Sequence, residues 1–271
     1  MLPQFTNKSE MFEWLHLNKD LVIRQKKAQI KYADAVNFNG YLGNESTSTI
    51  VNKAEGEITE IQADKLVVKA VINTTNLMDS HYDVHLPNLW KKSLNENRSI
   101  IHLQEHEMKF DKVITDDLSA YTEDISWKDL GYDYEGKTQA LVFESNISAE
   151  RNPYMFEQYK KGRVRNHSVG MQYVKVAMAV NSEDKWFKEE KEVWDKYIDQ
   201  VANKDQAEEL GMFFAVTEAK VIEGSAVLIG SNRITPTISV TEATKGTSTN
   251  INQEPSTDTL DWNYIIQQLK S

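Results

Sequence analysis

The segment from residue 163 to residue 173 combines a hydroxyl group with several hydrogen-bond donors. Ser168 opens a run of alternating apolar residues, Val169, Met171 and Tyr173, which predicts a half-buried β-strand. Four residues with N–H groups in their side chains come directly before it: Arg163, Arg165, Asn166 and His167. Such donors can stabilise negative charge that develops beside a hydroxyl. We therefore interpret Ser168 as a candidate nucleophile.

A serine hydroxyl is a weak nucleophile near neutral pH and needs a general base. His106 follows the apolar stretch 99–103 and precedes a polar turn, so it is predicted to lie at a strand end, where catalytic groups are often found. His167 adjoins Ser168 in the chain, but neighbouring residues of a strand point to opposite faces. His106 is therefore the preferred base.

The remaining histidines have structural interpretations. His102 has an apolar neighbour on each side, which favours a packed strand residue, and His16 lies in the N-terminal segment. A turn holds two histidines and two aspartates with metal-ligating atoms: Asp79, His81, Asp83 and His85. Their spacing matches no established metal motif, so we predict no metal and no cofactor.

A carboxylate should orient the imidazole and stabilise its charged form. Glu223 interrupts an apolar run that includes residues 221–222 and 226–229, where a carboxylate needs a partner to offset its desolvation. Glu218 is the nearest rival, and a strand-edge glutamate facing water is the alternative interpretation of Glu223.

Composition excludes several classes of protein. The 271 residues include no cysteine, which rules out thiolate zinc sites, disulfides and a cysteine nucleophile. A net charge of -10 argues against nucleic-acid binding through phosphate contacts. The first residues lack a basic start followed by an apolar run, and no stretch contains eighteen consecutive apolar residues, so we expect neither a signal peptide nor a membrane span.

The pattern predicts an α+β protein that is mainly β, without regular βαβ alternation. Strands are expected at 65–72, 99–103, 139–145, from Ser168 onward, and at 213–229 with a break at 222–225. Helices are expected near Ser9, from Pro87 to Leu94, from Ser148 to Gly162, and over 183–210 with an aromatic face. Residues 21–30 suit either helix or strand, and 37–48 suit a loop. Residues 111–136 are acidic, with Gly131 and Gly136 as turn signals.

We divide the chain into four parts. Residues 1–50 are interpreted as an N-terminal appendage and 51–235 as the main domain, with 183–210 as an inserted helical segment. Residues 236–258 are rich in Thr, Ser and Asn and predict a flexible linker. Residues 259–271 predict a short amphipathic helix, which either docks onto a partner or folds back onto the domain.

Three blocks of residues, in this order, resemble the tailed-phage prohead (head maturation) serine proteases, a family related in fold to the herpesvirus assemblins. The first block contains Asp79, Asp83, Val84, Leu86, Pro87, Trp90, Ser93 and Leu94, then Ile101 and His106. The second contains Gly162, Ser168, Val169, Gly170 and Met171. The third contains Thr217, Glu218, Glu223, Gly224, Ser225, Ala226 and Val227, then Gly230, Ser231 and Asn232.

The resemblance implies an assemblin-like β-barrel flanked by helices and a serine endopeptidase. His106 would be the general base, Ser168 the nucleophile and Glu223 the acidic third member. Arg163, Arg165 or backbone amides near Gly170 would supply the oxyanion and substrate contacts.

The resemblance also implies partners and a location. The substrate would be scaffold or capsid protein and also the chain itself, cleaved in the host-cell cytoplasm inside the assembling prohead. The assemblins imply a homodimer. The charge and the lack of a long apolar run give no reason to expect nucleic acid or a membrane as a partner.

The sequence departs from the family pattern at Asn88-Leu89-Trp90, at Glu107 and in the inserted segment 183–210. A catalytically inactive assembly module of the same fold therefore stays open as the alternative to a protease.

Overall fold

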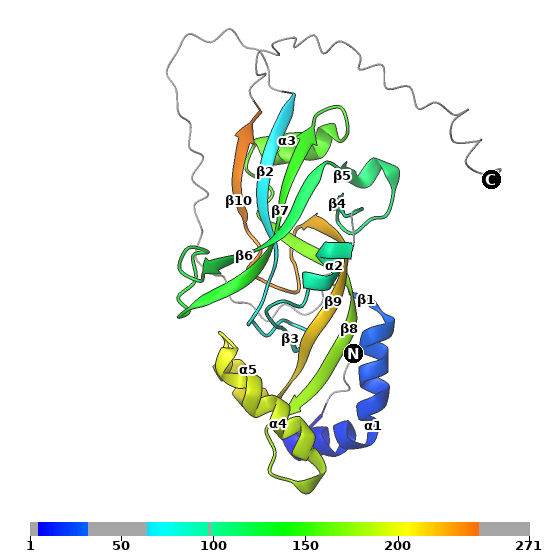
Figure 1. The fold of residues 1–271 in the computed structure, drawn as a ribbon, viewed down its shortest axis with the longest axis vertical. Helices are drawn as coiled ribbons and strands as arrows, with labels where there is room; N and C mark the ends of the chain where they lie inside the picture. The colour runs from blue at the N-terminus through cyan, green and yellow to red at the C-terminus, as the bar shows by residue number, and fades with distance from the viewer. Residues whose placement is uncertain (1–4, 32–63, 97–98, 244–271) are drawn as a thin grey trace, which may run out of the picture.

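The computed structural model describes residues 5–31, 64–96 and 99–243 (Figure 1). It is an α+β structure with more strand than helix, arranged in two sheets. The first sheet has the order β1-β8-β9-β4-β5, and β3 also pairs with β9. Its strands are β1 (Ile30–Lys31), β3 (Asp83–His85), β4 (Ile101–Gln104), β5 (Val113–Thr115), β8 (Asn166–Val180) and β9 (Met212–Val227).

The second sheet has the order β10-β2-β7-β6 and is antiparallel throughout. Its strands are β2 (Lys65–Thr74), β6 (Leu118–Ser126), β7 (Lys137–Ser148) and β10 (Thr237–Glu242). The strands of the described chain form these two open sheets and do not close into the barrel that the family resemblance implies.

The long strands β8 and β9 pair antiparallel over almost their whole length and form the spine of the molecule (Figure 1). Because side chains alternate between the two faces of a strand, one face of this strand pair lies against the second sheet. At Gly224 of β9 that approach is close, because a side chain there would overlap the Phe143 ring of β7, whose Cζ lies 2.9 Å from an added Cβ. Residues on either side of Gly224, including Glu223 and Ser225, therefore face away from the second sheet.

Five α-helices surround the described sheets: α1 (Lys8–Ala28), α2 (Lys91–Glu96), α3 (Pro153–Lys160), α4 (Lys188–Tyr197) and α5 (Lys204–Leu210). Three short 3-10 turns accompany them: η1 (Phe110–Lys112), η2 (Lys185–Phe187) and η3 (Ile198–Gln200). No helix in this part of the chain is long and apolar enough to cross a membrane.

Helix α1 begins at an Asn7 cap, whose side chain accepts a 2.9 Å hydrogen bond from the Glu10 amide. Its buried residues Met11, Leu15 and Val22 belong to the main hydrophobic core. The helix thus settles the ambiguity of residues 21–30, and the described part of the predicted appendage shares the core of the main domain instead of lying apart from it.

The inserted segment 183–210 is helical, as predicted. Trp194 of α4 is buried against Phe213 of β9, with ring centroids 5.2 Å apart, so an aromatic face does dock onto the domain. Trp186 of η2, in contrast, is 58% exposed.

Several predicted boundaries are wrong. Residues 111–136, where only turns at Gly131 and Gly136 are predicted, contain β5 and β6. The predicted linker from residue 236 begins with β10, which pairs with β2. The predicted break at 222–225 is absent, since β9 runs through it, and α3 is capped by Asn152 and not by Ser148. The expected loop 37–48 and the C-terminal helix 259–271 lie outside the described residues.

Candidate active site

Strands β8 and β9 place three of the predicted residues on one face. Ser168 is directly opposite Ser225, and Gly170 is directly opposite Glu223. Because directly paired residues share a face, as do residues two apart on one strand, all four lie on the face that points away from the second sheet. We call these residues, together with His106, the candidate face.

His106 reaches this face from the turn that follows β4. Strand β4 runs parallel to β9, and the Glu105 amide continues the pairing with a 2.9 Å hydrogen bond to the Ala226 carbonyl. The His106 amide then donates to the Ser225 hydroxyl over 3.0 Å. Glu105 and His106 both have left-handed backbone conformations, with φ of 54° and 59°, which is strained for residues with side chains. The turn is held in that conformation by β9.

The His106 ring contacts the Glu223 carboxylate. Nδ1 lies 2.6 Å from Oε1 of Glu223, whose side chain is fully buried. Because a carboxylate only accepts hydrogen bonds, Nδ1 carries the proton, and Nε2 is the basic nitrogen of the neutral ring. The second carboxylate oxygen, Oε2, accepts a 2.6 Å hydrogen bond from the Ser225 hydroxyl. Glu223 therefore binds both the His106 ring and the Ser225 hydroxyl, and that hydroxyl in turn accepts the hydrogen bond from the His106 amide.

The Gly170 position provides the space that Glu223 occupies. A Cβ atom at Gly170 would overlap Oε1 of Glu223 and lie 2.7 Å from Cδ. The structure thus adds a steric role for Gly170 to the oxyanion role predicted for its backbone, which stays a prediction.

Ser168 lies beneath a close crossing of the chain. Its side chain is 5% exposed, and its hydroxyl has no hydrogen-bond partner among the described residues. A Cβ atom at Gly230 would lie 3.7 Å from the Ser168 Cβ and 2.8 Å from the His167 carbonyl oxygen. The turn after β9 therefore covers the strand that carries Ser168, and only a residue without a side chain fits there.

Exposed apolar side chains follow the two strands that lead to the site. Met108 and Phe110, just after His106, are 55% and 92% exposed, and Leu228 and Ile229, just after β9, are 82% and 49% exposed. The two segments leave neighbouring parallel strands at the same end. Large exposed apolar groups are characteristic of binding surfaces.

Arg163 and Arg165 lie exposed between α3 and β8. Neither guanidinium forms a hydrogen bond or ion pair with Ser168 or Glu223 in the described part of the chain. Their oxyanion role therefore stays a prediction. Glu218 pairs instead with Lys175 at 2.5 Å and Lys92 at 3.9 Å, and the hydrogen bond from Lys175 lowers its pKa.

His102 and His167 lie on the opposite face, toward the core, as predicted. Tyr159 Oη joins them, 3.1 Å from His102 Nε2 and 2.9 Å from His167 Nε2. His102 Nδ1 lies 3.0 Å from Ser145 Oγ, and His167 Nδ1 lies 3.0 Å from the Thr235 carbonyl oxygen. Burial lowers the pKa of His167 to about 4 and that of His102 well below its usual value. Both rings are therefore neutral near pH 7.

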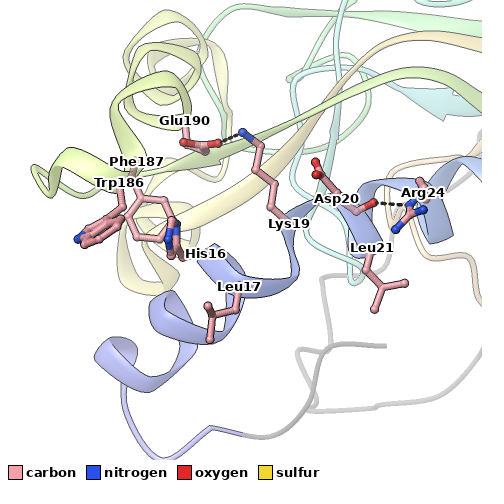
Figure 2. Close-up of a pocket in the computed structure, with 9 residues that line it drawn as sticks. All are labelled: His16, Leu17, Lys19, Asp20, Leu21, Arg24, Trp186, Phe187 and Glu190. Atoms are coloured by element: carbon pink, nitrogen blue, oxygen red, sulfur yellow. Dashed lines mark hydrogen bonds and ion pairs between the residues drawn. The ribbon is translucent and has the colours of Figure 1, made fainter.

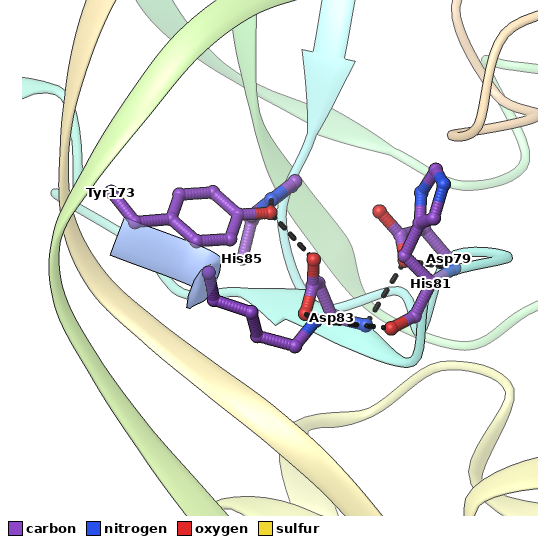
Figure 3. Close-up of polar contacts among 6 residues, drawn as sticks. Asp79, His81, Asp83, His85 and Tyr173 are labelled. Atoms are coloured by element: carbon purple, nitrogen blue, oxygen red, sulfur yellow. Dashed lines mark hydrogen bonds and ion pairs between the residues drawn. The ribbon is translucent and has the colours of Figure 1, made fainter. Parts of the chain in front are cut away.

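The turn considered for metal binding is part of a buried polar cluster (Figure 3). The Asp83 carboxylate pairs with Lys26 of α1 and accepts a 2.8 Å hydrogen bond from Tyr173 Oη, which also lies 2.9 Å from His85 Nε2. Burial, followed by the charge of Asp83, raises the pKa of Asp79. Across the described residues, no three histidine, aspartate or glutamate side chains are placed to share a metal ion.

A hollow of about 340 Å³ lies between α1 and the η2–α4 segment and is lined by none of the residues of the candidate face (Figure 2). His16 packs there against Trp186, with ring centroids 4.9 Å apart, and Lys19 pairs with Glu190. His16 is therefore a packing residue of this helix contact.

Comparisons with known proteins found no matching family model, no similar curated protein and no similar solved structure.

Proposed function

We propose that this chain is a serine endopeptidase of the prohead type, with Ser168 as nucleophile, His106 as general base and Glu223 as the acidic third member. The observation that carries the proposal is the His106–Glu223 hydrogen bond of 2.6 Å on the face that Ser168 shares. A buried carboxylate bound to Nδ1 of the His106 imidazole leaves Nε2 as the base. Hydroxyl activation then requires Nε2 to come within hydrogen-bond reach of Ser168 Oγ, which has no other hydrogen-bond partner among the described residues.

In the proposed reaction, His106 Nε2 takes the Ser168 proton as Oγ attacks a peptide carbonyl carbon. Glu223 stabilises the imidazolium, and donors from the backbone near Gly170 or from Arg163 or Arg165 stabilise the oxyanion. His106 then gives the proton to the leaving amine, which leaves an ester on Ser168. Water, deprotonated by the same ring, hydrolyses this ester and restores the hydroxyl.

The proposal also includes the substrate of the protease and the location of the cleavage. Scaffold or capsid protein would be cleaved within an assembling prohead, and the apolar side chains of Met108, Phe110, Leu228 and Ile229 would contact apolar residues of the substrate. The order of the residue blocks also supports an assemblin-like fold in which the two open sheets replace a closed barrel, and a dimer like that of the assemblins.

The alternative is an inactive assembly module of the same fold. Two predicted features would support such a module: the aromatic face of residues 183–210 and the amphipathic helix of residues 259–271. Trp194 of that aromatic face is buried within the chain and is not available to a partner, whereas Trp186 is 58% exposed. The strained turn that holds His106 against Glu223 favours catalysis, because such strain is characteristic of functional sites.

A fluorophosphonate probe tests the proposal without knowledge of the substrate, since it phosphonylates only activated serines. The expected result is one added probe per chain, located at Ser168 by peptide mass spectrometry, and none in the Ser168→Ala variant. Absence of labelling at Ser168 in folded protein, together with intact scaffold protein after incubation, would exclude the protease and favour the assembly module.

A further inference from the structure

Strand β6 forms an outer edge of the second sheet (Figure 1). It has 9 residues and pairs with β7 without a register shift. The other edge strands of the two described sheets are shorter: β1 has 2 residues, β5 has 3, and β10 has 6 with an irregular register. Short or bulged edges resist pairing with another chain, as do edges that carry proline or lysine. Strand β6 contains neither residue, so it is the described edge that best fits an added strand.

Hydrogen bonds at the two ends of β6 show which of its backbone groups face outward. The Asn146 amide donates to the Asp117 carbonyl over 2.9 Å, and the Trp127 amide donates to the Gly136 carbonyl over 3.3 Å. In an antiparallel pair, alternate residues direct both of their backbone groups toward the partner strand. The odd-numbered residues of β6 therefore bond to β7, and the even-numbered residues direct their N–H and C=O groups outward.

The outward groups form a row without backbone partners in the described part of the chain. They belong to Leu118, Ala120, Thr122 and Asp124. The row ends there, because the Ser126 carbonyl accepts a 3.3 Å hydrogen bond from the Leu130 amide. An extended peptide beside this row would form a ladder of hydrogen bonds like the one that β6 forms with β7.

Acidic side chains lie at both ends of this open edge. Asp116 and Asp117 precede β6, Asp124 lies near its end, and all three are exposed. None of them forms an ion pair with a described residue, whereas Glu123 pairs with Lys69 at 2.7 Å. Two copies of β6 side by side would place two sets of unpaired carboxylates on one interface. Cationic side chains at the ends of an added strand would instead be attracted to them.

We propose that the outer edge of β6 is a docking site for an extended, basic segment of a partner protein, which adds to the second sheet as a further strand. The backbone of that segment would pair with residues 118–124. Its lysine or arginine side chains would lie beside Asp124 at one end and beside Asp116 and Asp117 at the other. The site does not depend on the proposed protease function, because no residue of the candidate face lies in the second sheet.

Amide hydrogen exchange of the full chain, with and without a synthetic peptide at millimolar concentration, tests the proposal. The probe is Lys-Thr-Val-Thr-Val-Thr-Val-Thr-Lys, which is as long as residues 116–124. When it binds, the even-numbered amides from Leu118 to Asp124 should exchange roughly tenfold more slowly. The odd-numbered amides between them already bond to β7 and should change little. A control peptide with glutamate in place of both lysines should give little protection.

Variants of β6 separate the backbone contacts from the charges. Thr122→Pro removes an outward N–H group and leaves the hydrogen bonds to β7 in place, so it should abolish the protection. Thr122→Ala is the matched control, because it keeps the N–H group and should bind the peptide like the wild type. Asp124→Lys should weaken binding of the lysine peptide roughly fivefold to tenfold and strengthen binding of the glutamate peptide.

A second measurement covers the case in which Thr122→Pro does not fold. The lysine peptide, N-methylated at alternate residues so that the edge facing β6 cannot donate hydrogen bonds, should no longer protect the wild-type amides. The proposal is wrong if the unmodified lysine peptide leaves the even-numbered amides unprotected, or if the glutamate or N-methylated peptide protects them equally. Protection that appears without peptide as the protein concentration rises would show that β6 pairs with a second copy, which would also overturn the proposal.

Discussion

The Glu223 carboxylate occupies the space that a side chain at Gly170 would fill, since an added Cβ would overlap Oε1 and lie 2.7 Å from Cδ. These two residues are directly paired across β8 and β9. The position of the carboxylate under His106 therefore depends on the absence of a side chain on the neighbouring strand, two residues after the nucleophile.

Gly170→Ala should accordingly displace Glu223 and lower kcat by roughly 100-fold, because displacements of about 1 Å in a catalytic group have effects of that order. Gly224→Ala is the matched control, since it also adds a methyl group to this strand pair but toward Phe143 on the opposite face. It should lower the free energy of unfolding by about 1–3 kcal/mol through overpacking and leave kcat per folded molecule nearly unchanged. Peptide hydrolysis and urea unfolding of both variants distinguish the two effects.

Glu223→Gln tests the acidic member of the site. The amide keeps the shape but cannot stabilise an imidazolium or fix Nδ1–H in the same way, so kcat should fall by about 10³–10⁴-fold. Glu218→Gln is the control, because Glu218 contacts Lys175 and Lys92 on the surface instead of His106. Equal losses of kcat in the two variants would contradict the assignment of Glu223.

Ser225 is a positioning residue that joins the Glu223 carboxylate to the His106 backbone. Ser225→Ala leaves two buried polar groups without this partner, so unfolding should become easier by about 1–3 kcal/mol. The His106 turn should also shift, lowering kcat about 10- to 100-fold with KM little changed. Ser225→Thr keeps the hydroxyl and should recover part of kcat. A change confined to stability in both variants would show that Ser225 is structural only.

Part of this site could be predicted from sequence because its residues break local patterns. Glu223 is a carboxylate within an apolar run, and His106 ends an apolar strand. Ser225 carries no such signal, since a serine in a strand is common, although the spacing Glu-x-Ser does put both side chains on one face. The role of Gly170 depends on cross-strand register, which local sequence does not specify.

The fold, like the site, could be predicted only in part from the sequence. Strand β2 is rich in β-branched residues and β7 contains the apolar run 140–143, and the sequence predicts both. The sequence does not predict β6, because acidic and polar residues alternate with its apolar ones. It does not predict β10, because the Thr and Ser content of that strand is typical of a linker. Pairing with β7 and β2 makes both into strands, so tertiary contacts override the local signal.

The Tyr159 hydrogen bonds to His102 and His167 predict an acid-sensitive core. The folded-state pKa of His167 is about 4 and that of His102 lies well below its usual value, mainly through burial. Between about pH 6.5 and 4 the unfolded chain therefore binds protons that the folded protein does not. The free energy of unfolding should be highest above pH 6.5 and fall as the pH is lowered, by roughly 3 kcal/mol for His167.

Asp79 has the opposite effect on the pH dependence of the free energy of unfolding. Burial raises its pKa, so its contribution to stability is present at low pH and is lost as the pH rises. The control is His167→Gln, which keeps a side chain able to accept a hydrogen bond from Tyr159 but does not titrate. The free energy of unfolding, measured by urea unfolding at several pH values between 7 and 4, should depend less steeply on pH in this variant than in the wild type. Identical slopes would exclude His167 as the titrating group.

Lys26 predicts how firmly α1 is attached. Its ammonium pairs with the fully buried Asp83 carboxylate, and removing one member of a buried ion pair leaves an uncompensated charge. Lys26→Met should therefore lower the free energy of unfolding by about 3–5 kcal/mol, with faster amide exchange in α1 than in β8. The double variant Lys26→Met/Asp83→Asn removes both charges and should recover much of the loss, because neutral partners need less solvation. If the single and double variants are equally unstable, Lys26 stabilises the fold through contacts other than its ion pair with Asp83, such as that of its ammonium 4.1 Å from the centre of the Phe214 ring.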